Sequence, residues 1–170
     1  MSNEKIRKSV ERAIQYLDQY PEKARVIDPS ATCRIEDGLS CIVIAPDGTE
    51  VKTDMPPGVG GGASAPSPGW LMRAGLASCD ATAIAMRAAQ IGVHLTELEV
   101  IVDSESDDRG MFGMDHALAG PLSVRTRIRI AAKNADQDQL SEMLEWVEEH
   151  SPVADAIRRS VPMTTEIEFV

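Results

Sequence analysis

The most reactive side chain in this sequence is a cysteine within a segment of small residues. Cys79 lies in GLASCDATAIAM, residues 75–86, where most neighbours are glycine, alanine, serine or threonine. Cysteine attacks other molecules as the thiolate, which a nearby cation or a helix N-terminus favours. On a helix, its neighbours three and four positions away carry no cation; they are Gly75, Leu76, Thr82 and Ala83. Activation must therefore come from elsewhere in the fold or from a second subunit, or else Cys79 is a small buried packing residue.

The other two cysteines, Cys33 and Cys41, form no CxxC pair and no zinc-site spacing. Asp37-Gly38 stands between two β-rich runs and predicts a two-residue hairpin turn. That turn pairs Arg34 with Cys41, on the face opposite the isoleucines of the hairpin. The same register puts Cys33 and Cys41 on opposite faces, so we expect them to be packing residues that do not pair.

Three further residue groups resemble sites, but each is better explained as ordinary structure. The histidines have no metal-ligand spacing; they are His94, His116 and His150. The triple glycine at 60–62 lacks the Lys-Ser/Thr of a phosphate loop. The arginines at positions 125, 127 and 129 are expected to pair with Glu97, Glu99 and Asp103 on a neighbouring strand. The sequence therefore predicts neither a metal nor a cofactor.

The elements that must position these residues are helices and strands mixed along the chain, which indicates the α+β class. Residues 4–20 form an amphipathic helical pattern, and the runs between 33 and 53, with two Asp-Gly dipeptides, predict three antiparallel strands. Residues 54–66 have no periodicity and predict a loop. Further strands are predicted in 93–105, 121–132 and 163–170, and further helices around 140–147 and from Pro152 onward.

The helix that carries Cys79 is predicted over residues 67–91. Ser67 suits the N-cap, Pro68 the first helical position and Gly92 the C-cap. At ~1.5 Å per residue this helix is ~37 Å long. Its small side chains allow close approach of a neighbour, and its length exceeds what one domain of 170 residues usually needs to cover a sheet. We therefore infer that a second copy covers part of the helix, in a homodimer.

Composition and charge limit the class of protein. With 170 residues, 43% of them apolar and 26% charged, the chain suits one globular domain. The formal net charge of -10 argues against nucleic acid and against anionic membrane surfaces as partners. No apolar run approaches the ~20 residues of a membrane span, and the N-terminus lacks the apolar block of a signal peptide. The odd number of cysteines fits a reducing compartment, so the cytoplasm is the expected location.

Five segments follow one another in a recognisable order: a glycine-rich loop, PSPGWLMRAGLASC at the start of the long helix, VHLTELEV, DDRGMFGMD and HSPVADAI. Together they resemble the OsmC/Ohr family of thiol-dependent peroxidases. The resemblance runs from about Cys33 to Val170. It makes residues 1–20 an N-terminal helical extension and 21–170 an OsmC-like domain. It also implies an intertwined homodimer, with antiparallel sheets around a long central helix and two cysteine sites at the interface.

The resemblance implies roles for individual residues. In the family, a helix cysteine attacks an organic hydroperoxide, becomes a sulfenic acid and is resolved by a second cysteine, and a dithiol then restores the pair. Cys79, eleven residues after Pro68, falls on the reactive cysteine, and Ser151 falls on the resolving one, so the second thiol is missing. Gly69 stands where the peroxidase branch has a glutamate, and Arg34 corresponds to the activating arginine.

Two functions of different classes are consistent with these residues. In the first, Cys79 reduces organic hydroperoxides in a one-cysteine cycle with an external thiol reductant, as part of an oxidative stress response. In the second, the chain is a non-catalytic module that binds a small apolar ligand at the dimer interface, with Cys79 in the wall. The spacing of Cys79 favours the first, whereas Ser151 and Gly69 favour the second. Both predict a small-molecule partner and neither a nucleic acid nor a membrane.

Overall fold

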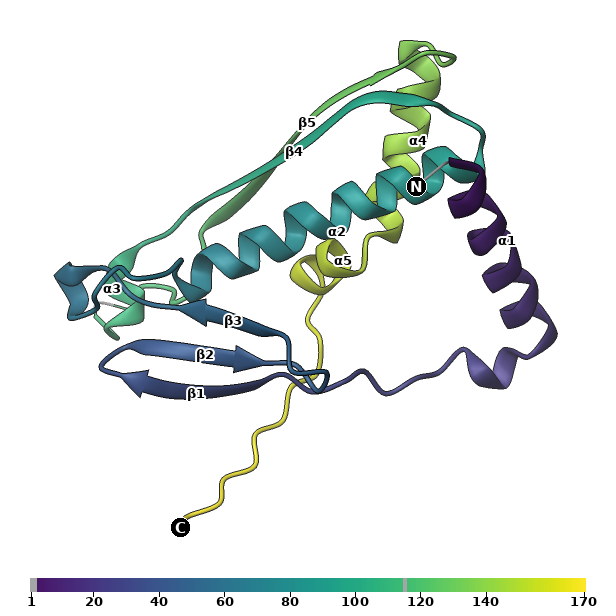
Figure 1. Ribbon diagram of the computed structural model, residues 1–170. Helices are drawn as coiled ribbons and strands as arrows, with labels where there is room; N and C mark the ends of the chain where they lie inside the picture. The colour runs from purple at the N-terminus through teal and green to yellow at the C-terminus, as the bar shows by residue number, and fades with distance from the viewer. Residues whose placement is uncertain (1–2, 115) are drawn as a thin grey trace. The chain divides into compact units, whose positions relative to one another are not determined.

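The computed structural model describes residues 3–114 and 116–170 and has the predicted α+β composition (Figure 1). By its internal contacts the chain divides into two compact units. The first unit comprises Met1–Arg7, Leu76–Ile101 and Thr126–Val170, and the second comprises Lys8–Gly75 and Val102–Arg125. The strands of the described residues form a three-stranded sheet, in the order β1-β2-β3, and a two-stranded sheet of β4 and β5.

Apart from the C-terminal strand, the predicted helices and strands are confirmed with small shifts at their ends. The helices are α1 (Asn3–Gln19), α2 (Pro68–Gln90), α3 (Asp108–Met111), α4 (Gln137–His150) and α5 (Pro152–Arg158), with two short 3-10 turns at Pro21–Lys23 and Pro57–Val59. The strands are β1 (Thr32–Asp37), β2 (Ser40–Ile44), β3 (Glu50–Thr53), β4 (Leu95–Glu105) and β5 (Ser123–Ala132). The short helix α3 was not predicted; its N-cap is Asp107, whose side chain accepts a hydrogen bond from the backbone N–H of Arg109.

The long helix α2 begins and ends as its sequence predicts. The Ser67 Oγ accepts a hydrogen bond from the Trp70 backbone N–H at 3.2 Å, which satisfies one of the free donors of the first turn. Pro68 occupies the first helical position, where its missing N–H costs nothing. After Gln90 the chain reverses at Gly92, whose φ of +77° is the left-handed conformation that glycine adopts at helix ends.

The core of the first unit lies where the C-terminal half of α2 meets α4. Ile84 is fully buried in this core. The other buried members of the cluster are Ala88, Val93, Met143 and Val147. Half-buried aliphatic side chains of the two-stranded sheet pack against it, among them Leu98, Val100, Ile128 and Ile130. Because Ile128 and Ile130 alternate with arginines along β5, one face of the strand is buried and the other is charged.

The predicted ion pairs of Arg125 and Arg129 between β4 and β5 are present. In the second unit Arg125 lies 3.0 Å from Asp103, and in the first unit Arg129 lies 3.2 Å from Glu97 and 3.4 Å from Glu99. These arginine side chains are about two-thirds exposed, so each pair contributes little to stability. They form a charged sheet surface of the ordinary kind.

The register of the first hairpin differs from the prediction. Asp37 pairs with Ser40, so the turn residues are Gly38 and Leu39, and a bulge between Ile35 and Asp37 shifts the pairing by one residue. Arg34 therefore pairs with Ile42 instead of Cys41. The predicted placement of Arg34 on the face opposite Ile42 was wrong, because the sequence gives no signal for the bulge.

The same shift brings two cysteines onto one face of the sheet. Cys33 pairs with Val43, and Cys41 pairs with Ile35. Residues paired across an antiparallel ladder share a face, so Cys33 and Cys41 are diagonal neighbours, contrary to the predicted opposite faces. Desolvation by neighbouring groups and a hydrogen bond with the Cys41 thiol raise the pKa of Cys33, although its side chain is exposed. Both cysteines are free thiols.

The predicted C-terminal strand is absent. Residues 160–170 are neither helix nor strand, although their apolar and polar residues alternate as in a strand. Met163 is 90% exposed and Phe169 is 92% exposed. A strand needs a neighbouring strand to pair its backbone groups, and this segment has none within the part of the chain that the structure describes. Alternation alone therefore predicted the strand wrongly.

A single carboxylate organises the glycine-rich loop of residues 54–66. Asp54 Oδ2 accepts hydrogen bonds from the Gly62 N–H at 3.1 Å, the Ser64 N–H at 2.9 Å and the Ser64 hydroxyl at 2.8 Å. These hydrogen bonds, chiefly those from Ser64, lower the pKa of Asp54. The loop also approaches itself closely, since a Cβ atom at Gly61 would lie 1.9 Å from the Met55 carbonyl oxygen. Glycine is therefore required at this position by close contact.

The N-terminal helix α1 is amphipathic, as predicted, and Asn3 at its start donates a side-chain hydrogen bond to the Val93 carbonyl at 3.1 Å. None of the described helices is both long enough and apolar enough to cross a membrane.

Candidate functional site

The candidate site lies in the first unit, at the middle of α2. Cys79 is half-buried there, and its Sγ lies 3.5 Å from the Ser151 Oγ. Ser151 follows α4 and is fully buried, with 0% of its surface exposed. The structure therefore brings together the two residues that the sequence assigns to the reactive and resolving positions.

Pro152 fixes the place of Ser151. A proline disfavours helical conformation in the residue before it, and Ser151 accordingly takes the extended values φ -80° and ψ 114°. This break separates α4 from α5, which begins at Pro152. Although serine at this position usually caps the next helix, the Ser151 hydroxyl makes no hydrogen bond to the first turn of α5. The hydroxyl is instead directed at α2.

The partner of Ser151 on α2 is a buried carboxylate. Ser151 Oγ donates to Asp80 Oδ1 at 2.5 Å, and Asp80 is only 9% exposed. The hydroxyl has one proton, and a carboxylate accepts it more strongly than a sulfur does. The lone pairs of Ser151 Oγ therefore face the Cys79 thiol. The three groups form a hydrogen-bonded chain that runs from the Cys79 thiol through the Ser151 hydroxyl to the Asp80 carboxylate.

Sequence reasoning missed Asp80. The signal was present, since Asp80 is the one charged residue between Arg73 and Arg87 in the primary sequence. A carboxylate in a helix of small apolar residues needs a polar partner if it is buried. The periodicity of α2 does not reveal that partner, because Ser151 is 71 residues away along the chain.

The other two family positions lie in the second unit. Arg34 is an exposed residue of β1, opposite Ile42. Gly69 lies in the first turn of α2, where a Cβ atom would lie 3.9 Å from Arg73 Nη1, so the space there would admit a side chain. Arg73 donates from Nη1 to Ser104 Oγ at 3.1 Å. An activating role for Arg34 stays a prediction.

A metal site is not evident in this region. Among the described residues, no three His, Cys, Asp or Glu side chains gather closely enough to hold a metal ion. The Cys79 thiol lies beside the Ser151 hydroxyl, which is bonded to the Asp80 carboxylate.

Comparison with solved structures shows the same fold in several bacterial proteins. An OsmC like protein from Mycoplasma pneumoniae is similar with a TM-score of 0.67 and 15% identity, over 79% of this chain and 89% of that one. An organic hydroperoxide resistance protein OsmC from Legionella pneumophila has a TM-score of 0.58 and 19% identity, over 79% and 91%. The organic hydroperoxide resistance protein OhrB of Bacillus subtilis has a TM-score of 0.53 and 20% identity, over 79% and 93%.

No curated protein sequence matches the chain. A family model described as OsmC-like protein, however, matches residues 60–166, which include the long helix, Cys79 and Ser151. The chain therefore belongs to the OsmC-like protein family.

Proposed function

We propose that the protein reduces organic hydroperoxides through Cys79, in a one-cysteine cycle completed by an external thiol. The observation that carries this proposal is the contact between the Cys79 thiol and the Ser151 hydroxyl at the resolving position, at 3.5 Å. Structural neighbours described as organic hydroperoxide resistance proteins support the reaction class. The active form is a homodimer in the cytoplasm.

The first half of the cycle oxidises Cys79. Its thiolate attacks the outer oxygen of the hydroperoxide, a sulfur–oxygen bond forms, and the oxygen–oxygen bond breaks. Cys79 becomes a sulfenic acid, and the departing alkoxide takes up a proton and leaves as the alcohol. The Ser151 hydroxyl, held by Asp80, is placed to accept a hydrogen bond from the thiol before the reaction and from the sulfenic acid after it.

The second half requires sulfur from outside. A hydroxyl does not resolve a sulfenic acid to a disulfide, so Ser151 cannot perform that step. An external thiol attacks the Cys79 sulfur, water leaves, and a mixed disulfide forms. A second thiol then attacks the mixed disulfide, restoring the Cys79 thiol and releasing an oxidised disulfide product.

A binding module is the second candidate function, because Ser151 and Gly69 replace two functional groups of the peroxidase branch. In this alternative a small apolar molecule occupies the site, and Cys79 forms part of its wall.

Stopped-flow mixing with cumene hydroperoxide distinguishes the two functions. We expect Cys79 to be oxidised, with a dimedone adduct on the Cys79 peptide and alcohol released in equal amount. Cys79→Ser should abolish both signals, whereas the double variant Cys33→Ser, Cys41→Ser should retain them. An unmodified Cys79 after excess peroxide would refute the peroxidase and leave the binding module.

A further inference from the structure

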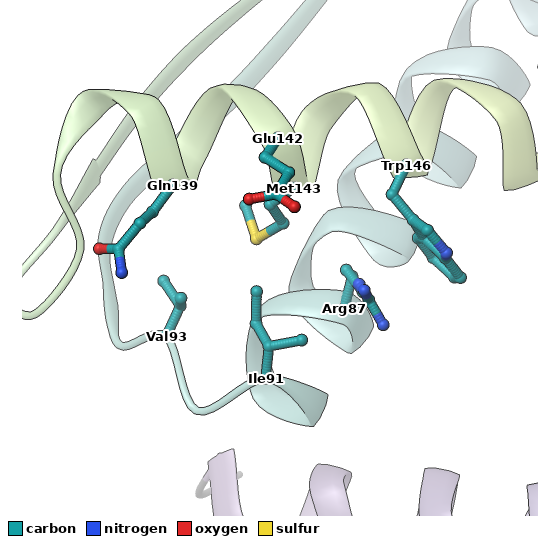
Figure 2. A pocket seen from close by; sticks show the side chains of 7 residues that line it. All are labelled: Arg87, Ile91, Val93, Gln139, Glu142, Met143 and Trp146. Atoms are coloured by element: carbon teal, nitrogen blue, oxygen red, sulfur yellow. The ribbon is translucent and has the colours of Figure 1, made fainter.

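A second candidate site lies on the first unit, apart from Cys79. A pocket of about 360 Å³ is formed by the end of α2, the residues that follow it and one face of α4 (Figure 2). It is lined by Arg87, Ile91, Val93, Gln139, Glu142, Met143 and Trp146. This volume is at the small end of the range for ligand sites, ~300–1,000 Å³. The pocket, called here the α2/α4 pocket, therefore suits a small molecule.

One wall of the α2/α4 pocket is an arginine that lies over an aromatic ring. The Arg87 guanidinium carbon lies 4.3 Å from the centre of the Trp146 ring, and Trp146 stacks in turn on His150 with ring centres 4.0 Å apart. Arg87 Nη1 donates to the Gln90 side chain at 2.8 Å. Its Nε is buried and has no hydrogen-bond partner among the described residues. A buried donor without a partner is uncommon in native proteins, and the Nη atoms are the donors of Arg87 that remain for a ligand.

A negatively charged side chain, that of Glu142, lines the same pocket. Glu142 projects from α4, while Arg87 lies over Trp146 (Figure 2). Within the described residues, no ion pair joins Glu142 to Arg87. The sequence of α4 contains several acidic residues and neither lysine nor arginine. A purely anionic ligand would meet this negative charge, whereas a ligand with both charges would complement Arg87 and Glu142.

The remaining lining is apolar. Met143 and Val93 are buried, and Ile91 is partly exposed beside them. The pocket thus offers a cation, an anion and an aliphatic and aromatic surface within one small volume.

We propose that the α2/α4 pocket binds a small apolar α-amino acid. Its carboxylate accepts hydrogen bonds from the Arg87 guanidinium, its ammonium group pairs with Glu142, and its side chain packs on Ile91, Met143 and Trp146. Such binding is independent of the reaction at Cys79.

Trp146 provides the test. The chain has two tryptophans, so Trp70→Phe leaves Trp146 as the single emitter. In this background we expect a saturable change of Trp146 fluorescence with L-leucine. The deaminated acid 4-methylpentanoate and the decarboxylated amine isoamylamine should each bind at least about tenfold more weakly, since each lacks one charge.

Variants of Arg87 and Glu142 measure how much each charged side chain contributes to the binding of L-leucine. Arg87→Met keeps much of the side-chain volume and should weaken L-leucine binding at least about tenfold. Glu142→Gln should weaken L-leucine binding and strengthen 4-methylpentanoate binding, because it removes the negative charge that repels a simple anion. Glu145→Gln, a matched change on α4 outside the pocket lining, should have no effect. Circular dichroism checks that each variant is folded.

Heteronuclear NMR titration of the same protein supplies a readout that does not depend on fluorescence. The proposal is overturned by the absence of saturable shifts at pocket residues with L-leucine. It is equally overturned if 4-methylpentanoate binds as tightly as L-leucine, or if both charge variants bind L-leucine like the parent.

Discussion

Ser151→Cys supplies the missing thiol and tests the geometry of the candidate site. Ser151 Oγ lies 3.5 Å from Cys79 Sγ, and a disulfide needs its two sulfurs ~2.05 Å apart, so they must approach by ~1.5 Å. A side-chain rotation together with a small backbone shift can provide that distance. We therefore expect one equivalent of cumene hydroperoxide to convert the variant to a disulfide between positions 79 and 151.

The two states of this variant should differ clearly in stability. In the reduced state the hydrogen bond from Ser151 to Asp80 is lost, which lowers the free energy of unfolding by about 2 kcal/mol. In the oxidised state the bond closes a loop of 72 positions, for which the chain-entropy relation gives a stabilisation of ~4.4 kcal/mol. The oxidised variant should therefore be about 2 kcal/mol more stable than the parent protein.

Urea denaturation with and without dithiothreitol measures the free energies of unfolding of the reduced and oxidised variant. Peptide mapping by mass spectrometry identifies the disulfide between positions 79 and 151. Ser151→Ala is the matched control, because it loses the same hydrogen bond and cannot form the disulfide. Free thiols at both positions after peroxide treatment, with no change in the urea midpoint, would show that the two side chains do not meet in solution as they do here.

Three further predictions address the core, the hairpin thiols and the assembly. Ile84→Ala should lower the free energy of unfolding by about 3 kcal/mol, measured in urea, because it opens a cavity in a fully packed core; a loss under ~1 kcal/mol would contradict the packing described. Because the pKa of Cys33 is raised, the rate of its alkylation by iodoacetamide should increase at a higher pH than for an ordinary thiol. Cys41→Ala should move this increase to lower pH. Identical pH profiles for the parent and the variant would disprove the contact between Cys33 and Cys41. Light scattering should give a dimer mass at micromolar concentration for the full chain and after deletion of residues 1–20, and a monomer mass for the full chain would refute the homodimer.

The parts of the fold that the sequence predicted depend on local chemistry. Ser67, Pro68 and Gly92 each act within one helical turn of their own position, so the bounds of α2 could be read directly. The alternation along β5 likewise reflects burial of one face. The resemblance to the OsmC/Ohr family, confirmed by the match over residues 60–166, rested on the order of several such segments.

The parts that were missed depend on contacts between distant segments. The bulge near Glu36 changed which residues share a face of the hairpin, and no residue type in this segment predicts a bulge. The alternation of residues 163–170 predicted a strand, but a strand forms only where another strand offers hydrogen bonds. The proximity of Ser151 to Cys79 was expected from the family, whereas Asp80 became visible only when the fold placed it against Ser151.

The Asp54 carboxylate changes how the glycine-rich loop should behave in solution. Its composition is that of a flexible linker, yet the backbone N–H groups of Gly62 and Ser64 are both bonded to one side chain. Amide hydrogens held in this way exchange slowly with solvent deuterium, even outside helices and strands. The loop should therefore show protected amides at Gly62 and Ser64, and their protection should fade as the pH falls through the lowered pKa of Asp54. Replacing the segment with a generic glycine-serine linker would keep its composition and lose its order.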